Sequence, residues 1–290
     1  MFVPDKILEQ KLRQMLAEDI GLGDVTSQAI IPSDLIVNAS IIAKEKGVAA
    51  GIEEATVLAE SLGLRVKANV ADGKTVKNKQ VLIEISGDAR TLLSAERTML
   101  NLISRMSGIA TATRMLTEKL KKVGSLAKVA ATRKSAPGLL YFDKRAVVIG
   151  GGDPHRLHLD DMVLIKDNHI AIVGSAEEAV KKAKANISFT KKIEVEVTSV
   201  QDVLKVAQAG ADAIMLDNFS VKQVKEAAAL LEKAGFLGDV VLEASGGIKA
   251  EDILSYAAAK IDIISLGYLT QSTKALDISL EIMEEQRGTL

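Results

Sequence analysis

The sequence predicts an α/β protein with a mixed antiparallel α/β domain over residues 1–105 and an incomplete parallel α/β barrel over residues 106–267. From about residue 125 onward, short apolar runs alternate with amphipathic helical stretches, which is typical of a parallel sheet with helical crossovers. Before that point most apolar runs are joined by short turns, a pattern that favours antiparallel pairing.

The N-terminal part begins with a predicted helix over residues 5–19 and the turn-rich stretch "GLGDVTSQ". Four apolar runs predict strands: "VNASIIAK", "GVAAG", "LRVKANV" and "QVLIEISG". The Gly and Asn of "DGKTVKNKQ" indicate a hairpin connection, and one helix is expected near residues 53–63. Two further helices, 89–105 and 108–122, are predicted to lead into the barrel.

Seven apolar runs then follow, and they are continuous enough to be covered on both faces: "LAKVAATR", "AVVIGGG", "MVLIKDN", "KKIEVEV", "DAIMLDN", "DVVLEASGG" and "IDIISLG". Several are separated by helix-like segments that begin with Ser or Ala: "SAEEAVKKAKAN", "SVQDVLKVAQAG", "SVKQVKEAAALLEKAG" and "AEDILSYAAAK". Seven strands suggest a closed or nearly closed barrel with one unit missing. A doubly wound open sheet is the alternative arrangement of the same elements.

The composition excludes several classes of protein. The 290 residues carry 37 Lys and Arg against 38 Asp and Glu, which argues against a global positive field for nucleic acid or a membrane surface. Zero Cys removes disulfides and thiol chemistry, and 3% aromatic residues weaken base stacking. No basic stretch leads into an apolar run at the N-terminus, and no segment approaches the roughly 20 apolar residues of a membrane helix. We expect a soluble, cytoplasmic protein without nucleic-acid or membrane partners.

Charged residues gather where the predicted barrel strands end, which is where a parallel barrel carries its catalytic groups. Five basic residues follow three of these ends: Arg133, Lys134, His155, Arg156 and Lys166. Arg pairs with carboxylate or phosphate oxygens and Lys adds a point charge, so the set suits a ligand with several carboxylates or phosphates. The glycine runs "IGGGD" and "ASGGI" allow backbone N–H groups to approach a phosphate.

Two carboxylates, Glu196 and Asp217, end neighbouring strands and are predicted to face one another across the same rim. Beside bound phosphates such a pair usually holds Mg²⁺, directly or through water. Glu194 shares the face of Glu196 but lies deeper, where it could be a buried partner for a Lys. The competing role for Asp217, a helix N-cap, is better filled by Ser220.

The three histidines, His155, His158 and His169, also allow a zinc site to be considered. No Cys supports such a site, and Arg156 and Lys166 would repel a bare cation. The sequence therefore disfavours a histidine-based metal centre.

In this order the motifs resemble the quinolinate phosphoribosyltransferase family. The resemblance covers nearly the whole chain and is most specific in "AERTMLN", "GGGDPHR" and "IKDNH". It extends through "EDIGLGDVTS", "ATRKSAPG", "EVEV", "GADAIMLDN", "LEASGGI" and "DIISLGYLTQS". The family fold implies an N-terminal α/β sandwich domain plus an incomplete seven-stranded parallel α/β barrel. It also implies that a C-terminal helix, within residues 268–290, returns to the N-terminal domain.

The resemblance implies an enzyme of NAD biosynthesis, a glycosyltransferase. Its substrates would be quinolinate and phosphoribosyl pyrophosphate, and Mg²⁺ would be its cofactor. Its products would be nicotinate mononucleotide, pyrophosphate and carbon dioxide.

Residue roles follow from the same resemblance. Three positions match those that grip the quinolinate carboxylates, namely Arg133, His155 and Arg156. The expected catalytic residues, which contact phosphoribosyl pyrophosphate, both substrates, or the ribose and metal, are Lys134, Lys166, Glu196 and Asp217. The 5′-phosphate cradle is matched by Ser245, Gly246, Gly247 and Gly267.

Arg97, in "AERTMLN", matches an arginine that enters the active site of the neighbouring subunit. The resemblance therefore implies a homodimer, or a dimer-based hexamer, with shared active sites. The chain departs from the family pattern at three positions, where the family usually has Thr, Arg and His: Ser135, Leu140 and Gln271.

Two other functions remain open from the sequence. A paralogous transferase of the same fold, acting on another base, is the nearer one, and the full set of quinolinate-gripping residues argues against it. A barrel aldolase or isomerase for sugar phosphates would need a Schiff-base Lys or an acid/base pair inside the barrel.

Overall fold

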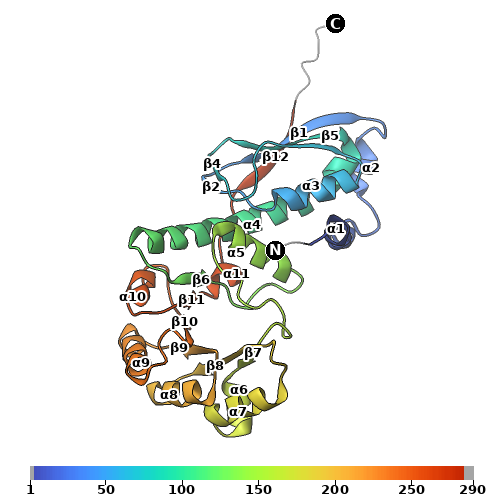
Figure 1. Cartoon of the computed structure of the whole chain (residues 1–290). Helices are drawn as coiled ribbons and strands as arrows, with labels where there is room; N and C mark the ends of the chain where they lie inside the picture. The colour runs from blue at the N-terminus through green and yellow to red at the C-terminus, as the bar shows by residue number, and fades with distance from the viewer. Residues whose placement is uncertain (1–2, 284–290) are drawn as a thin grey trace. The chain divides into compact units, whose positions relative to one another are not determined.

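The computed structural model describes residues 3–283 and divides the chain into two compact units (Figure 1). The first unit contains the chain up to Ala112, residues 148–150 and the segment that begins at Thr273. The second contains Thr113–Val147 and Gly151–Ser272. The predicted division fell at residues 105/106 and 267/268, so both boundaries lie a few residues further along the chain.

The first unit is a mixed α/β domain with antiparallel pairing, as predicted. Its four-stranded sheet has the order β12-β1-β5-β3, with β12 (Ile278–Ile282), β1 (Ile36–Ala43), β5 (Val81–Asp88) and β3 (Arg65–Ala68). A two-stranded sheet joins β2 (Gly47–Val48) to β4 (Thr75–Val76). Three helices accompany these strands: α1 (Asp5–Ile20), α2 (Val25–Ile30) and α3 (Ile52–Ser61).

A single helix, α4 (Ala89–Lys122), replaces the two helices predicted over 89–105 and 108–122. Gly108, the first residue of the second predicted helix, lies within this helix. A Cβ at Gly108 would collide with the backbone of Lys274 and Ala275. The glycine therefore permits close packing of another chain segment and does not end the helix.

The predicted C-terminal helix within 268–290 is wrong. In the described part of this range, up to residue 283, the one helix is the short α11 (Tyr268–Gln271), and the chain continues into strand β12. This strand pairs antiparallel with β1, from Ala43 opposite Ile278 to Ala39 opposite Ile282. The "ISLEI" of β12 has the period-two apolar pattern of a strand, and pairing with β1 overrides the helix-forming residues around it. Residues 284–290 of the predicted helix lie outside the described part of the chain.

The second unit is built on a parallel sheet with the strand order β6-β11-β10-β9-β8-β7. Its strands are β6 (Lys128–Ala130), β7 (Val163–Ile165), β8 (Ile193–Val197), β9 (Ala213–Asp217), β10 (Val241–Ser245) and β11 (Ile263–Ser265). The predicted helices between them are present as α7 (Ala176–Asn186), α8 (Val200–Ala209), α9 (Val221–Ala234) and the shorter α10 (Ile253–Ala257). The α/β class and the barrel-like parallel arrangement are therefore confirmed.

The count of seven barrel strands is corrected to six in the described residues. The run "AVVIGGG" does not form a strand but ends helix α5 (Leu140–Gly150). In this helix Phe142, Ala146 and Val147 are buried, a spacing that belongs to one helical face. The seventh place is held by a single parallel bridge between Ala130 and Asp153.

The register of strands β8, β9 and β10 brings their charged and polar side chains to the same side of the sheet. Glu196 lies opposite Met215, Met215 lies opposite Glu243, and Asp217 lies opposite Ser245. Because side chains alternate along a strand, the residues two positions earlier point to the same side. Polar residues at alternate positions of β8, β9 and β10 therefore share one interior. Among the described residues, no helix combines the length and apolar character needed to cross a membrane.

Candidate active site

A cavity of about 360 Å³ opens at the carboxyl ends of the parallel strands in the second unit. Its polar and charged lining contains nine of the twelve predicted site residues, namely Arg133, Lys134, His155, Arg156, Lys166, Glu196, Asp217, Ser245 and Gly246. The remaining lining residues are Ala131, Thr132, Leu164, Met215, Glu243 and Ser265. The structure therefore brings most of the predicted site residues together at one cavity, as expected from strand ends that meet at one rim.

Three predicted site residues lie outside this lining. Gly247 directly follows Gly246, and Gly267 lies against the side chain of Lys134, whose Cδ would be 3.1 Å from an added Cβ. Arg97 belongs to α4 and to the first unit, where its side chain is exposed.

A larger hollow of about 610 Å³ lies at the opposite, amino-terminal ends of β6 and β11. Leu126, Leu254 and Asp262 are among the residues that line it. Its charged lining consists of Lys260 and Asp262, and in parallel barrels this end contributes to stability and not to chemistry. The smaller cavity is therefore the candidate active site.

The loop after β6 is held in place from two sides. The hydroxyl of Thr132 accepts a hydrogen bond from the backbone N–H of Lys134 at 3.2 Å. The buried Thr270 hydroxyl donates to the carbonyl oxygen of Lys134 at 2.8 Å. With Gly267 beneath its side chain, Lys134 is directed along the cavity rim.

Glu196 and Asp217 form an acidic pair on neighbouring strands. Burial raises the pKa of Glu196, and the charge of Asp217 raises it further, while Lys166 and Lys134 act in the opposite direction. Ser220 caps α9, accepting the N–H of Gln223, so the predicted preference of Ser220 over Asp217 as N-cap is confirmed. Asp217 is free of capping and can act in the cavity.

The turn after β9 is joined to the glycine loop after β10 through Asn218. Its backbone N–H donates to the carbonyl of Ser245 at 2.9 Å, and its Nδ2 donates to Asp217 at 2.7 Å. Asn218 has a positive φ of 57°, and Gly246 has one of 92°. A Cβ at Gly246 would be 2.5 Å from the Asn218 Oδ1, so only glycine fits this close approach.

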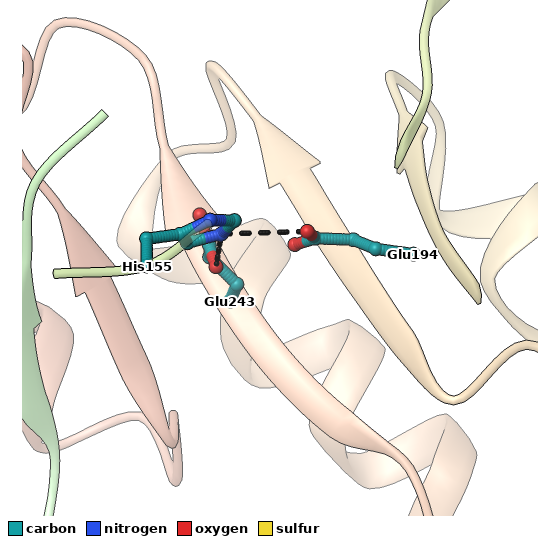
Figure 2. A group of neighbouring side chains, drawn as sticks. All are labelled: His155, Glu194 and Glu243. Carbon is teal, nitrogen blue, oxygen red and sulfur yellow. Dashed lines mark hydrogen bonds and ion pairs between the residues drawn. The ribbon is translucent and has the colours of Figure 1, made fainter. Parts of the chain in front are cut away.

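At the base of the cavity, His155 lies between two buried carboxylates from different strands, as Figure 2 shows. Its Nε2 is 3.1 Å from Glu243 Oε2 and 3.3 Å from Glu194 Oε2. Both glutamates are 1% exposed. The predicted Lys partner for Glu194 is therefore wrong, because its ion-pair partner is His155.

The two buried glutamates stabilise the charged form of the His155 ring. Burial disfavours the charged ring, but the two carboxylates outweigh this and raise the pKa of His155 to about 10. Burial also raises the pKa of Glu194. The backbone N–H of Arg156 lies 2.8 Å from Nδ1 of His155 and ties the ring to the loop that carries Arg156. The raised pKa of His155 therefore means that the ring is favoured in its charged form between the two carboxylates.

Sequence reasoning missed Glu243 and Lys144. Glu243 lies two residues before Ser245 on β10, so strand alternation could have placed it in the interior. Lys144, on α5, is fully buried and donates to the carbonyl oxygens of Ala131 and Pro154. Burial lowers the pKa of Lys144 to about 8. No sequence signal distinguished it from an exposed helical lysine.

The histidines are not gathered into one metal site in the described residues. His155 is bound to the glutamates, and His158 groups with Asp160 and Asp161 on an exposed loop. His169 Nδ1 accepts the N–H of Lys166 at 2.9 Å at the start of α6 (Asp167–Val173). Each imidazole therefore has a separate local environment.

The sequence profiles of two protein domains match most of the chain. The profile of the quinolinate phosphoribosyl transferase N-terminal domain matches residues 24–107, and that of its C-terminal domain matches residues 109–281. A relative from Methanothermobacter thermautotrophicus, named "Probable nicotinate-nucleotide pyrophosphorylase (carboxylating)", is 44% identical over 271 residues, covering 93% of this chain and 97% of its own. A Mycobacterium leprae relative named nicotinate-nucleotide pyrophosphorylase (carboxylating) is 39% identical over 276 residues, covering 93% and 95%.

Solved structures agree with the sequence relatives. The nicotinate-nucleotide pyrophosphorylase of Francisella tularensis superimposes with a TM-score of 0.87 at 36% identity, covering 97% of this chain and 98% of that one. The Ehrlichia chaffeensis protein of the same name gives a TM-score of 0.86 at 33% identity, covering 97% and 99%. The fold, the cavity at the strand ends and both domain profiles lead to one conclusion: the chain belongs to the quinolinate phosphoribosyltransferase family.

Proposed function

We propose that the cavity transfers the phosphoribosyl group of phosphoribosyl pyrophosphate to quinolinate and releases carbon dioxide, giving nicotinate mononucleotide and pyrophosphate for NAD biosynthesis. The observation that carries the proposal is the convergence of four Arg and Lys side chains and an acidic pair on one cavity. Two anionic substrates need such cations, and a reaction at ribose needs carboxylates beside them. The relatives named as carboxylating pyrophosphorylases support the same chemistry.

Arg133, Arg156 and Lys166 bind the two carboxylates of quinolinate, and His155 lies beside them at the cavity base. Arg156 is 9% exposed, and both burial and the charge of Arg133 lower its pKa. Two guanidinium groups that repel one another gain from a dianion placed between them. The geometry therefore favours a ligand with two adjacent carboxylates over a neutral base.

Phosphoribosyl pyrophosphate lies along the acidic pair and the glycine loop, with Lys134 at the rim. The 5′-phosphate is received by Ser245, Gly246 and Gly247 together with Gly267, where backbone N–H groups can approach it. The residues present also fit Mg²⁺, because Glu196 and Asp217 are two neighbouring carboxylates, and burial together with the charge of Asp217 raises the pKa of Glu196. When bound, the cation would neutralise negative charge on the leaving pyrophosphate.

The reaction needs no covalent nucleophile from the protein. The pyridine nitrogen forms a bond to the anomeric carbon while the bond to the pyrophosphate oxygen breaks, and the departing group carries away the electron pair. Positive charge develops on the ribose as the bond to pyrophosphate breaks. A carboxylate such as Glu196 or Asp217 stabilises this charge. The ring, now positively charged, accepts the electron pair left when the adjacent carboxylate departs as carbon dioxide. A proton then replaces the lost group.

Replacing Gly246 by Ala is expected to raise the KM for phosphoribosyl pyrophosphate roughly tenfold or more, since the strain of a side chain at positive φ must be absorbed in the phosphate loop. The KM for quinolinate should change little. Gly235→Ala is the matched control, because Gly235 also has a positive φ, 78°, but nothing lies within 4 Å of its added Cβ. An unchanged KM for phosphoribosyl pyrophosphate in the Gly246 variant would remove this loop from the phosphate site.

The proposed reaction is tested by measuring carbon dioxide release from carboxyl-labelled quinolinate. Release should require quinolinate, phosphoribosyl pyrophosphate and Mg²⁺ together, and omission of any one should abolish it. If no carbon dioxide appears while phosphoribosyl pyrophosphate still raises the melting temperature, the phosphate site stands and the accepted base is another compound. The departures at Leu140 and Gln271 make that outcome the alternative to exclude.

A further inference from the structure

Two buried carboxylates at the base of an anion-binding cavity need a physical explanation. Glu243 is 1% exposed and lines the cavity, while Glu194 is 1% exposed and lies behind it. Negative charge there would repel quinolinate, and the proposed reaction uses neither side chain. Buried ionic groups are costly unless they are paired, so the contacts of these glutamates indicate their role.

The backbone and the ring of His155 are both fixed by contacts inside the protein. Its backbone has a positive φ of 53°, and its N–H donates to Asp153 Oδ1 at 2.8 Å. Its Nδ1 lies 2.8 Å from the backbone N–H of Arg156, and its Nε2 faces the two glutamates (Figure 2). A non-glycine residue in this left-handed conformation persists only when the surroundings fix it. Contacts inside the protein at both ring nitrogens therefore fix the orientation of the His155 ring.

The glutamates also counter the charges of the neighbouring cations. Glu243 favours the charged form of Lys144, and Glu194 favours the charged form of Arg156. Lys144 joins the end of β6 to the turn that carries His155, because it donates to Ala131 and Pro154. The loop that carries Arg156 is therefore fixed in two ways. Lys144 donates a hydrogen bond to its backbone, and Glu194 and Glu243 contact the ring of His155.

We propose that Glu194 and Glu243 are positioning residues for quinolinate, which fix the His155 ring and thereby set the loop that presents Arg156 to the substrate. This inference rests on the proposed function. It assigns His155 a linking role between this loop and strands β8 and β10. A metal ion between His155 and the two glutamates is disfavoured by the positive charges of Arg156 and Lys144 close by.

Glu243→Gln tests the proposal, because the amide keeps the size of the side chain and removes its charge. The KM for quinolinate should rise about tenfold or more, as is usual when an outer partner of a ligand-binding group is replaced. The KM for phosphoribosyl pyrophosphate and the rise in melting temperature that it causes should stay as in the wild type. Glu226→Gln is the control, since Glu226 is an exposed glutamate on α9 and should change neither constant.

A double-mutant cycle with His155→Ala shows whether Glu243 acts through the ring. If it does, Glu243→Gln should add little to the quinolinate KM of the His155→Ala variant. Additive effects, an unchanged quinolinate KM, or equal changes for both substrates would overturn the proposal. If Glu243→Gln does not fold, Glu194→Gln serves the same cycle, because it contacts the same nitrogen.

The wild-type protein supplies an independent measurement. In ¹⁵N-histidine spectra, His155 should stay in its charged form throughout the neutral range, because two buried carboxylates face its Nε2. The signal is assigned by its loss in a His155→Asn variant, since the chain has 3 His. A ring that titrates near the ordinary histidine value would contradict the arrangement. Failure of quinolinate-dependent carbon dioxide release in the wild type would instead reject the proposed function, so the two failures are distinguishable.

Discussion

Replacing Asp217 by Asn is expected to lower kcat by on the order of 10² to 10³, the range found when one preorganised electrostatic group of an active site is removed. Asp217 ends β9 at the cavity and lies next to Glu196, whose pKa it raises. The substitution keeps the size of the side chain and its hydrogen-bonding capacity toward Asn218. The lost activity would therefore measure the charge and not the packing.

The same variant should also need more Mg²⁺ for half-maximal rate, because one of the two carboxylates proposed to hold the cation is gone. Steady-state rates over a range of Mg²⁺ concentrations give both quantities. Asp239→Asn, an exposed aspartate in the loop before β10, is the control and should change neither. A variant with wild-type kcat and an unaltered Mg²⁺ requirement would show that Asp217 lines the cavity but takes no part in catalysis or Mg²⁺ binding.

Much of the site could be predicted because it follows from local rules. Lys166 directly follows β7, Asp217 ends β9, and Ser245 ends β10. Parallel strands bring their carboxyl ends to one rim, so finding where a strand stops is enough to bring these residues together. Alternation along β8 and β10 also explains why residues two positions deeper face the same interior.

The errors arose where packing decides between two local possibilities. "AVVI" is β-branched enough for a strand, yet it ends helix α5 and buries Val147 on the same face as Phe142. Two helices were predicted over 89–105 and 108–122, but they form the single helix α4, in which Gly108 allows another segment to pack closely. "ISLEI" lies among helix-forming residues and becomes a strand because β1 offers it a pairing edge. Each outcome depends on a partner distant in sequence.

The buried network beneath the cavity was beyond local rules for the same reason. His155 and Glu243 are 88 residues apart in the chain, and Lys144 contacts carbonyl groups of two separate loops. A sequence shows that a glutamate faces inward, but it does not show which cation meets it. The predicted Lys partner of Glu194 failed on this point, since an imidazole occupies the place.

Replacing Arg97 by Ala is expected to reduce activity on the order of 10²-fold or more while the chain remains folded, because substrate positioning by an Arg clamp is lost. Arg97 is exposed on α4 and does not line the cavity of its own chain. We propose that it completes the active site of a second copy, as the family resemblance implies. Lys134→Ala should be equally inactive, since Lys134 lies in the cavity itself.

Mixing the two inactive variants under conditions that exchange subunits distinguishes a shared site from an indirect effect. A heterodimer of Arg97→Ala and Lys134→Ala contains one site with both native residues, and random pairing should restore about a quarter of wild-type activity in a two-fold symmetric dimer. Mixing Lys134→Ala with Lys166→Ala is the matched control. Both changes fall in the same cavity, so neither site of that heterodimer is intact. Verified Arg97/Lys134 heterodimers without activity would show that Arg97 acts within its own chain or only on folding, whereas recovery confined to that mixture requires each site to be built from two chains.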